Sequence, residues 1–268
     1  MSKYAISTFL ICSFLFVGFL WGVDVSQLLN IQSLVIVIGG LCMVIWLGFP
    51  SDRLKGTVNS VREAFGSKDL EREGKMLLAD ALRLAKIYRL HGPVALQKAA
   101  SKVGDDFLRY GAVLVAEGYD QVSLLNSLQR EYIKRNEKGA SQIQLLQTMC
   151  KLAPALGMAG TVISLMQVMQ NLGAEGNLGP SLGLALSSTL YGILLANLFF
   201  LPATVKLQQY FSKKAANMRI VMDALLGIQK AEHPLRIAER LNSYDLYLKL
   251  KKAEGKKPRL VRFNKKAA

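Results

Sequence analysis

The sequence predicts an all-α, polytopic membrane protein with four transmembrane helices and a helical cytoplasmic domain. Of the 268 residues, 51% are hydrophobic, and the mean hydropathy is +0.25, which is too apolar for an ordinary globular domain. Four long stretches carry no charged residue, and each contains a run close to the roughly 20 apolar residues that cross a bilayer. These stretches are residues 4–23, 25–51, 152–174 and 176–205. Elsewhere apolar residues recur at helical spacing, and no segment alternates like a strand.

The first two spans are expected to form a transmembrane hairpin over residues 1–50, with helices at 4–23 and 33–50. Lys3 precedes an apolar core, as in a signal peptide, but no small-residue cleavage site follows. Trp21 falls at interface depth. The first helix is therefore expected to be retained, and Pro50 ends the second.

A helical cytoplasmic domain is expected over residues 51–150. The segment SKDLEREGKMLLADALRLAKIYRLHG has apolar residues at helical spacing, and a His-Gly-Pro sequence at 91–93 ends it. A short helix and loop, PVALQKAASKVGDD, precedes a further helix in DDFLRYGAVLVAEGYD, which has two aspartates at its positive end. From Val122 the helical pattern continues to Pro154 without a strong break. One continuous helix is therefore expected to enter the third span.

The last two spans are predicted within residues 151–205, followed by a cytoplasmic C-terminal helix and basic tail over 206–268. Residues 52–150 hold 16 Lys and Arg against 12 Asp and Glu, and residues 206–268 hold 16 against 5. The turns DVSQLLNIQ and GAEGNLG contain neither Lys nor Arg. By the positive-inside rule, both termini and the middle segment are cytoplasmic. Beside a membrane, such a tail favours anionic lipid over nucleic acid as its partner.

No Asp, Glu, His, Lys or Arg lies within the four predicted spans. Because membrane proton relays and ion paths depend on such residues, this chain cannot carry a proton on its own side chains, and either no ion moves or a partner supplies the titrating group. The last two spans instead carry small and hydroxylic residues, which usually serve helix packing. Thr161 and Thr189 are candidates to line a path, because each has a glycine nearby. Pro154 and Pro202 both lie toward the cytoplasmic side, where each permits a kink.

An enzyme is not indicated, because the sequence holds no nucleophile–base set, phosphate-binding loop or metal cluster. His91 and His233 are isolated, and the three cysteines have no metal-ligand spacing. No cofactor is expected. A solute carrier or free-standing channel is disfavoured by the large helical cytoplasmic segment and by the lack of charged or broken mid-span sites.

Several stretches resemble the MotA/PomA family, the flagellar stator ion-channel subunits, within the MotA/TolQ/ExbB superfamily. The stretches are LLNIQSLVIVIGGLCMVIWLGFP, FLRYGAVLVAEGYD, LAPALGMAGTVISLMQVMQNLG, LGPSLGLALSSTLYGILLANLFFLPATVKL and GIQKAEHPLRIAERL. Their order and spacing match the family nearly as far as Leu241. The hairpin of two spans before the cytoplasmic segment argues against the more distant ExbB and TolQ proteins, which usually have one.

The resemblance implies that five copies surround two copies of a MotB/PomB-type, peptidoglycan-anchored partner in the bacterial inner membrane. An aspartate on each partner helix binds the proton or sodium ion, and ion flow drives the rotor through the switch protein FliG. Thr161, Thr189 and Ser188 would belong to the ion pathway. Pro154 and Pro202 would couple ion release to movement.

On the cytoplasmic helix, Arg109 and Glu117 match the charged rotor-contact positions of the family and, eight residues apart, can share a helix face. Tyr110 and Lys151 depart from the family pattern. Tyr110 stands where a basic residue is common, and Lys151 where an acidic or small residue is often found. Thr161 resembles the sodium-driven members, which favours sodium over protons, although some proton-driven relatives keep this threonine. The alternative is an ExbB/TolQ-like energy-transducing subunit that powers a non-flagellar process.

Overall fold

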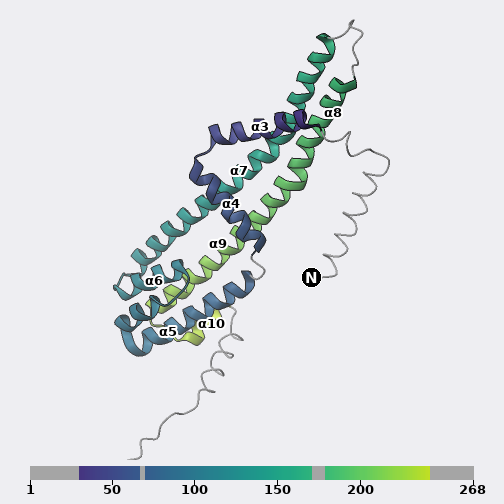
Figure 1. The fold of residues 1–268 in the computed structure, drawn as a ribbon. Helices are drawn as coiled ribbons and strands as arrows, with labels where there is room; N and C mark the ends of the chain where they lie inside the picture. Colours follow the sequence, from purple (N-terminus) through teal and green to yellow (C-terminus); the bar gives the residue numbers. More distant parts are fainter. Residues whose placement is uncertain (1–29, 67–69, 171–178, 242–268) are drawn as a thin grey trace, which may run out of the picture. The chain divides into compact units, whose positions relative to one another are not determined.

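The computed structural model describes residues 30–66, 70–170 and 179–241, and every regular element in these ranges is a helix. Figure 1 shows their order. The elements are α3 (Ile31–Gly48), α4 (Ser51–Gly66), α5 (Leu70–Ala100), α6 (Asp106–Ala116), α7 (Gln121–Gln170), α8 (Gly179–Leu194), the π-helix η1 (Leu195–Phe200), α9 (Leu201–Gln229) and α10 (Pro234–Arg240). The predicted first span at 4–23 and the basic tail lie outside the described residues.

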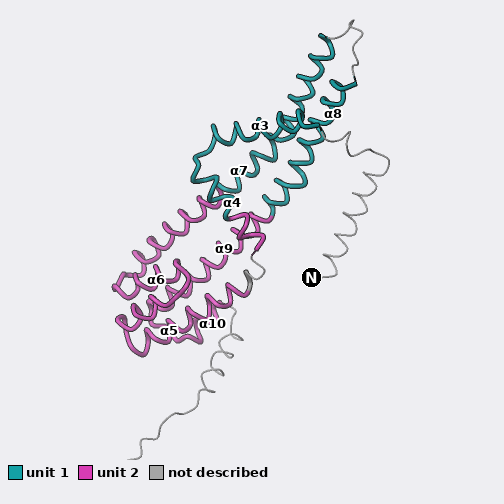
Figure 2. Tube along the Cα trace, viewed as in Figure 1, with its two compact units in different colours: residues 1–59, 141–205 teal, residues 60–140, 206–268 magenta. Residues whose placement is uncertain are grey.

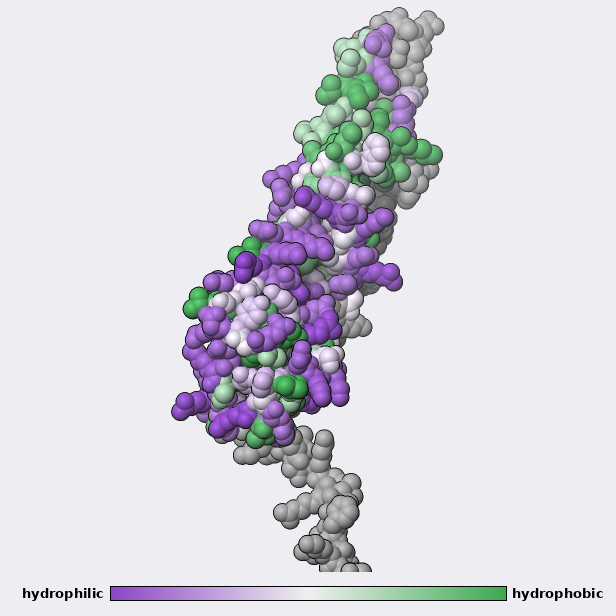
Figure 3. Space-filling model, turned by 90° about the vertical axis from the view of Figure 1, so that its left-hand side faces the viewer, coloured by the Kyte–Doolittle hydropathy of each residue, from purple (hydrophilic) through white to green (hydrophobic). Residues whose placement is uncertain are grey.

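The chain divides into two compact units (Figure 2). We call residues 1–59 with 141–205 the span unit, and residues 60–140 with 206–268 the polar unit. Three described helical stretches are long and apolar enough to cross a membrane: Ile31–Gly48, part of Gln121–Gln170 and part of Gly179–Gln229. In Figure 3, hydrophobic residues gather over the span helices, whereas hydrophilic residues dominate the surface of the polar unit.

Helix α3 has clear start and stop signals. The Oδ1 atom of Asn30 accepts hydrogen bonds from the backbone N–H groups of Gln32 and Ser33 at 3.1 and 3.4 Å, which satisfies two of the unpaired donors of the first turn. After Gly48 the backbone becomes extended at Phe49. Pro50 cannot donate to a continuing helix, and so α4 starts anew just after it.

Helix α5 changes direction at Gly92, which has a φ of 74°. This conformation favours glycine because a Cβ would clash there, and Pro93 follows at the start of the second half of the helix. The predicted break at residues 91–93 is thus confirmed. In α6, Asp105 accepts a hydrogen bond from the N–H of Leu108 at 2.7 Å, and Gly118, with a φ of 83°, follows the C-terminal end of the helix.

Helix α7 runs unbroken from Gln121 to Gln170 through Pro154, as the pattern predicted. Asp120 begins it by accepting hydrogen bonds from the N–H groups of Val122 and Ser123 at 3.2 and 3.3 Å. The pKa of the Asp120 carboxyl is lowered mainly by a hydrogen bond from the side chain of Ser123 and next by one from the backbone of Ser123. Both bonds stabilise the charged form of the carboxyl. The carboxylate also suits the positive end of the helix.

The core of the polar unit consists of aliphatic side chains and one phenylalanine, contributed mainly by α5, α6, α7, α9 and α10. Its largest fully buried members include Leu96, Phe107, Leu108, Leu124, Leu128, Leu225, Ile228 and Ile237. Helices α6 and α10 both pack against α5. This core holds α6 in place and thereby presents its outer, charged face.

Candidate functional site

Helices α7 and α8 approach each other so closely that glycine is required at their contact. A Cβ on Gly192 would lie 2.5 Å from the carbonyl oxygen of Ala153, and one on Gly157 would lie 2.8 Å from that of Ser188. Both obstacles are backbone atoms, which cannot rotate away as a side chain can. The pairing of Ala153 with Gly192 and of Gly160 with Ser188 shows that the two helices run antiparallel. The small residues thus act in helix packing, as expected for membrane helices.

Ser188 lies at the centre of this contact and is completely buried. Its hydroxyl oxygen is 3.1 Å from the carbonyl oxygen of Gly157 on α7 and 2.8 Å from that of Ala185 on its own helix. One hydroxyl proton can serve either acceptor. In the single chain, Ser188 therefore links α7 to α8, and its predicted place in the ion pathway would require access through neighbouring residues.

Thr161 and Thr189 are half-buried and lie near the same contact. Thr161 donates its hydroxyl proton to the carbonyl oxygen of Met158 at 2.6 Å. Since the proton is used within the helix, the oxygen lone pairs remain available to accept a hydrogen bond or to bind a cation. The Cα of Thr189 faces Gly157, which is one helical turn from Thr161 on the same face of α7. The structure thus brings the two predicted pathway threonines to neighbouring positions.

Sequence reasoning missed a polar contact between α3 and α8. Ser33 is fully buried and donates to the carbonyl oxygen of Leu184 at 3.0 Å. Beside it, the N–H of Asn30 donates to the hydroxyl of Tyr191 at 2.9 Å. A lone serine near the start of an otherwise apolar helix is a weak signal, but a hydroxyl in that setting needs a partner. These bonds attach α3 to the helix pair.

A π-helix, η1, lies immediately before Pro202, where the proline predicted a kink. The N–H of Leu201 donates to the carbonyl of Ala196, five residues back, in the turn immediately before the proline. The thiol of Cys150 on α7 donates to the same carbonyl at an Sγ–O distance of 3.7 Å. A wider turn of this kind often marks a functional position in a helix. Sequence reasoning singled out Pro202 as a helix-bending position but did not predict the π-helix.

The two prolines predicted to couple ion release to movement are staggered along the helix pair. Pro154 follows Ala153, whose carbonyl contacts Gly192. Pro202 lies ten residues beyond Gly192 in chain order (202 − 192). Each proline removes one helix hydrogen bond at its own level. The helix pair therefore lacks a backbone hydrogen bond at two successive heights along its length, and we call these two heights the weakened helix levels.

The predicted rotor-contact residues lie at the exposed surface of α6. Arg109 forms an ion pair with Asp106 in the first turn of the same helix, a partner that sequence reasoning did not assign. Glu117 is the C-cap residue and keeps a helical backbone, with φ −76° and ψ −3°. Both residues and the neighbouring Tyr110 are exposed. The face therefore carries an acid beside its arginine and a second acid two turns away.

Within the described residues no three or more His, Cys, Asp or Glu side chains come together as metal ligands. The described spans offer hydroxyl and carbonyl oxygens instead, on helices packed through glycine. Together with the charged helical domain, these features define a class: a polytopic, all-helical membrane protein whose described spans carry no charged side chain.

Known proteins of this class match the chain over most of its length. The MotA/TolQ/ExbB proton channel family matches residues 99–220. Motility protein A of Treponema pallidum is 30% identical over 228 residues, covering 85% of this chain and 87% of that protein. Chemotaxis protein PomA of Vibrio alginolyticus is 28% identical over 232 residues, covering 87% and 90%. The chain belongs to the MotA/PomA family of flagellar stator subunits.

The fold agrees with this assignment. The flagellar MotAB stator complex from Bacillus subtilis contains a chain that superposes with a TM-score of 0.75 at 25% identity, covering 93% of this chain and 98% of that one. The resemblance stated from the sequence is thus confirmed, and so is the predicted all-α fold of a membrane protein with a helical domain.

Proposed function

We propose that this chain is the ion-conducting stator subunit of a bacterial flagellar motor and turns proton or sodium flow into torque together with a MotB/PomB-type partner. The observation that carries the proposal is the combination of family membership with predicted spans that contain no Asp, Glu, His, Lys or Arg. A chain of this composition can form the wall of an ion path but cannot itself bind and release the ion by titration. The partner must supply the carboxylate.

In this proposal, five copies form a ring around two partner helices in the inner membrane, with both termini in the cytoplasm. The lack of Lys and Arg in the two turns between spans supports the orientation. Each ion that crosses releases about 2.3 kcal/mol per elementary charge per 100 mV of membrane potential. That energy is enough to bias the rotation of the ring by one step about the anchored partner.

Thr161 and Thr189 are the proposed lining of the path beside the partner's carboxylate. The hydroxyl of Thr161 already donates within its helix, so its oxygen lone pairs are available to replace part of the water shell of a cation. This arrangement favours sodium, whose hydration can be replaced by oxygen ligands. Ser188 would stabilise this lining through its hydrogen bond to the backbone of α7.

The proposed coupling runs through the weakened helix levels at Pro154 and Pro202. At the end of the π-helix before Pro202, a hydrogen bond reaches five residues back to Ala196, and the Cys150 thiol shares this acceptor. Such a segment can change its hydrogen-bond pattern at low cost. Movement that begins at the ion path would pass along α7 and α9, both of which continue into the polar unit.

Thr161→Ala tests the ion-path assignment. We expect swimming to be lost or its dependence on sodium to change, because the hydroxyl oxygen that would contact the ion is removed, while the complex still assembles. The matched control is Thr148→Ala on the same helix, since Thr148 also donates to a preceding backbone carbonyl, that of Gln144, at 2.9 Å. Swimming speed is measured across sodium concentrations and pH. A Thr161→Ala strain that swims like the wild type in every medium would remove Thr161 from the path.

A further inference from the structure

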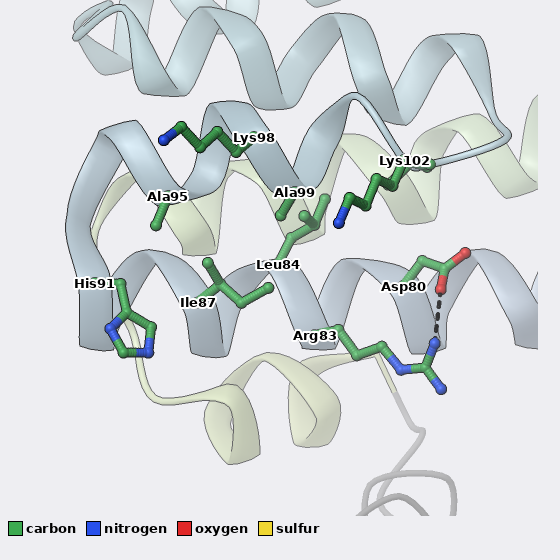
Figure 4. Close-up of a pocket in the computed structure, with 10 residues that line it drawn as sticks. Asp80, Arg83, Leu84, Ile87, His91, Ala95, Lys98, Ala99 and Lys102 are labelled. Carbon is green, nitrogen blue, oxygen red and sulfur yellow. Dashed lines mark hydrogen bonds and ion pairs between the residues drawn. The ribbon is translucent and has the colours of Figure 1, made fainter.

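The two halves of α5, on either side of Gly92, and the turn that follows the helix line a groove of about 530 Å³ on the polar unit. Figure 4 shows side chains from both halves around this groove. The apolar lining consists of Leu84, Ile87, Ala95, Ala99 and Val103. The polar lining consists of Asp80, Arg83, His91, Lys98 and Lys102.

The charge around the groove is positive. Asp80 is the single acid among the residues that line it, and its Oδ1 atom lies 3.4 Å from Nη1 of Arg83. Lys98 is exposed on the second half of α5, and Lys102 is exposed in the turn that follows this helix. After Asp80 and Arg83 compensate each other, the charges of the two lysines remain. The groove therefore attracts acidic groups.

The groove is elongated. Along the first half of α5 its lining extends from Asp80 to His91, and eleven residues of helix correspond to roughly 16 Å. The cations are distributed along this length rather than converging on one point. Binding sites for small molecules instead place a few polar groups around one enclosed cavity. The shape thus suits an extended apolar ligand with acidic groups along its edges.

We propose that this groove binds an acidic amphipathic helix of a cytoplasmic protein. Helices commonly dock by laying an apolar stripe into an apolar groove. Ala95 and Ala99 have short side chains on one wall and so permit the close axial distance, about 8–10 Å, of packed helices. Lys98 in the last turn of α5 and Lys102 in the turn that follows the helix provide two cations for carboxylates on the incoming helix.

This interaction surface is separate from the rotor-contact residues in its composition, because neither Arg109 nor Glu117 lines the groove. It also does not depend on the flagellar role, since a binding assay on the purified protein does not involve swimming. Charge attraction would steer the acidic helix toward the groove, and the apolar lining would hold it.

The test uses the full-length chain purified with its partner subunit. The probe is a fluorescent synthetic helix that carries a leucine stripe flanked by glutamates at i and i+4, and binding is followed by fluorescence anisotropy. The double variant Lys98→Glu with Lys102→Glu is expected to weaken binding at least tenfold. The control, Lys134→Glu with Lys138→Glu, reverses two exposed lysines of the same spacing on α7 and should change it less than twofold. Ala95→Trp fills the groove without changing charge and should also weaken binding at least tenfold.

Equal weakening by the two lysine pairs, or normal binding by Ala95→Trp, would contradict the proposal, because attraction would then be unspecific. Displacement of the peptide by inorganic phosphate or ATP at constant ionic strength would also contradict it and indicate a site for small anions. A change in the number of subunits per ring in the Lys98 and Lys102 variant would instead assign the groove to contact between copies. If the charge-reversed pair does not fold, Lys98→Gln with Lys102→Gln provides the same comparison.

Discussion

The helices of the span unit and those of the polar unit pack through opposite kinds of residue. In the span unit, α7 and α8 meet where side chains are absent, with Gly157 and Gly192 against backbone atoms. In the polar unit, the helices meet through large buried side chains such as Phe107 and Leu225. In lipid, apolar side chains gain nothing by leaving their solvent, so close backbone packing takes over. In water, the burial of large side chains drives assembly.

The comparison predicts that enlarging a residue harms the span unit most. Gly192→Leu should abolish assembly and swimming, because its Cβ would lie 2.5 Å from the Ala153 carbonyl oxygen and neither helix backbone can give way. Gly183→Leu on the same helix is the control, since nothing lies within 4 Å of its Cβ position in the chain. Assembly is measured by co-purification with the partner. Intact complexes from Gly192→Leu would show that the glycine contact is dispensable.

Shortening a residue should harm the polar unit most. Phe107→Ala is expected to destabilise this unit by about 3–5 kcal/mol, because it removes a ring that is 1% exposed and leaves a cavity in the core. Phe65→Ala offers a control, since Phe65 is 59% exposed and packs little within the chain. Thermal unfolding of the purified complex measures the difference. Equal losses from both substitutions would mean that burial in the single chain does not identify the core.

The smallest effect on stability is expected on the charged surface of α6. Arg109→Glu breaks an exposed ion pair with Asp106, and such pairs contribute only about 0–1 kcal/mol. If Arg109 contacts the rotor, torque should nevertheless fall strongly, since the sign of a contact charge is reversed. Arg130→Glu on α7 reverses another exposed arginine for comparison. Unchanged torque in cells with a single stator type would remove Arg109 from the rotor contact.

The sequence predicted most helices because their signals are local. The glycine at 92, the two aspartates at the start of α6 and the uninterrupted pattern through Pro154 each act within a few residues. These signals depend on backbone conformation and helix capping, which a short stretch of the sequence reveals. Helix identity was therefore predictable without any knowledge of the tertiary contacts.

The candidate site was less predictable because its details depend on contacts between helices. The residue types of Thr161 and Ser188 suggested the same role for both. Only the packing of α7 on α8 separates the half-buried threonine from the fully buried serine. The π-helix before Pro202 likewise involves the thiol of Cys150, 46 residues earlier in the chain. Neither relation leaves a mark in the local pattern.

The central claim is that this chain forms an uncharged wall and that a partner supplies the ion-binding carboxylate. Ion flux into vesicles tests it most directly, with the chain reconstituted alone and then together with the MotB/PomB-type subunit. We expect no proton or sodium flux above that of empty vesicles for the chain alone, and flux with the partner that disappears when the partner's membrane aspartate is neutralised. A proton or sodium leak through the chain alone would contradict the account.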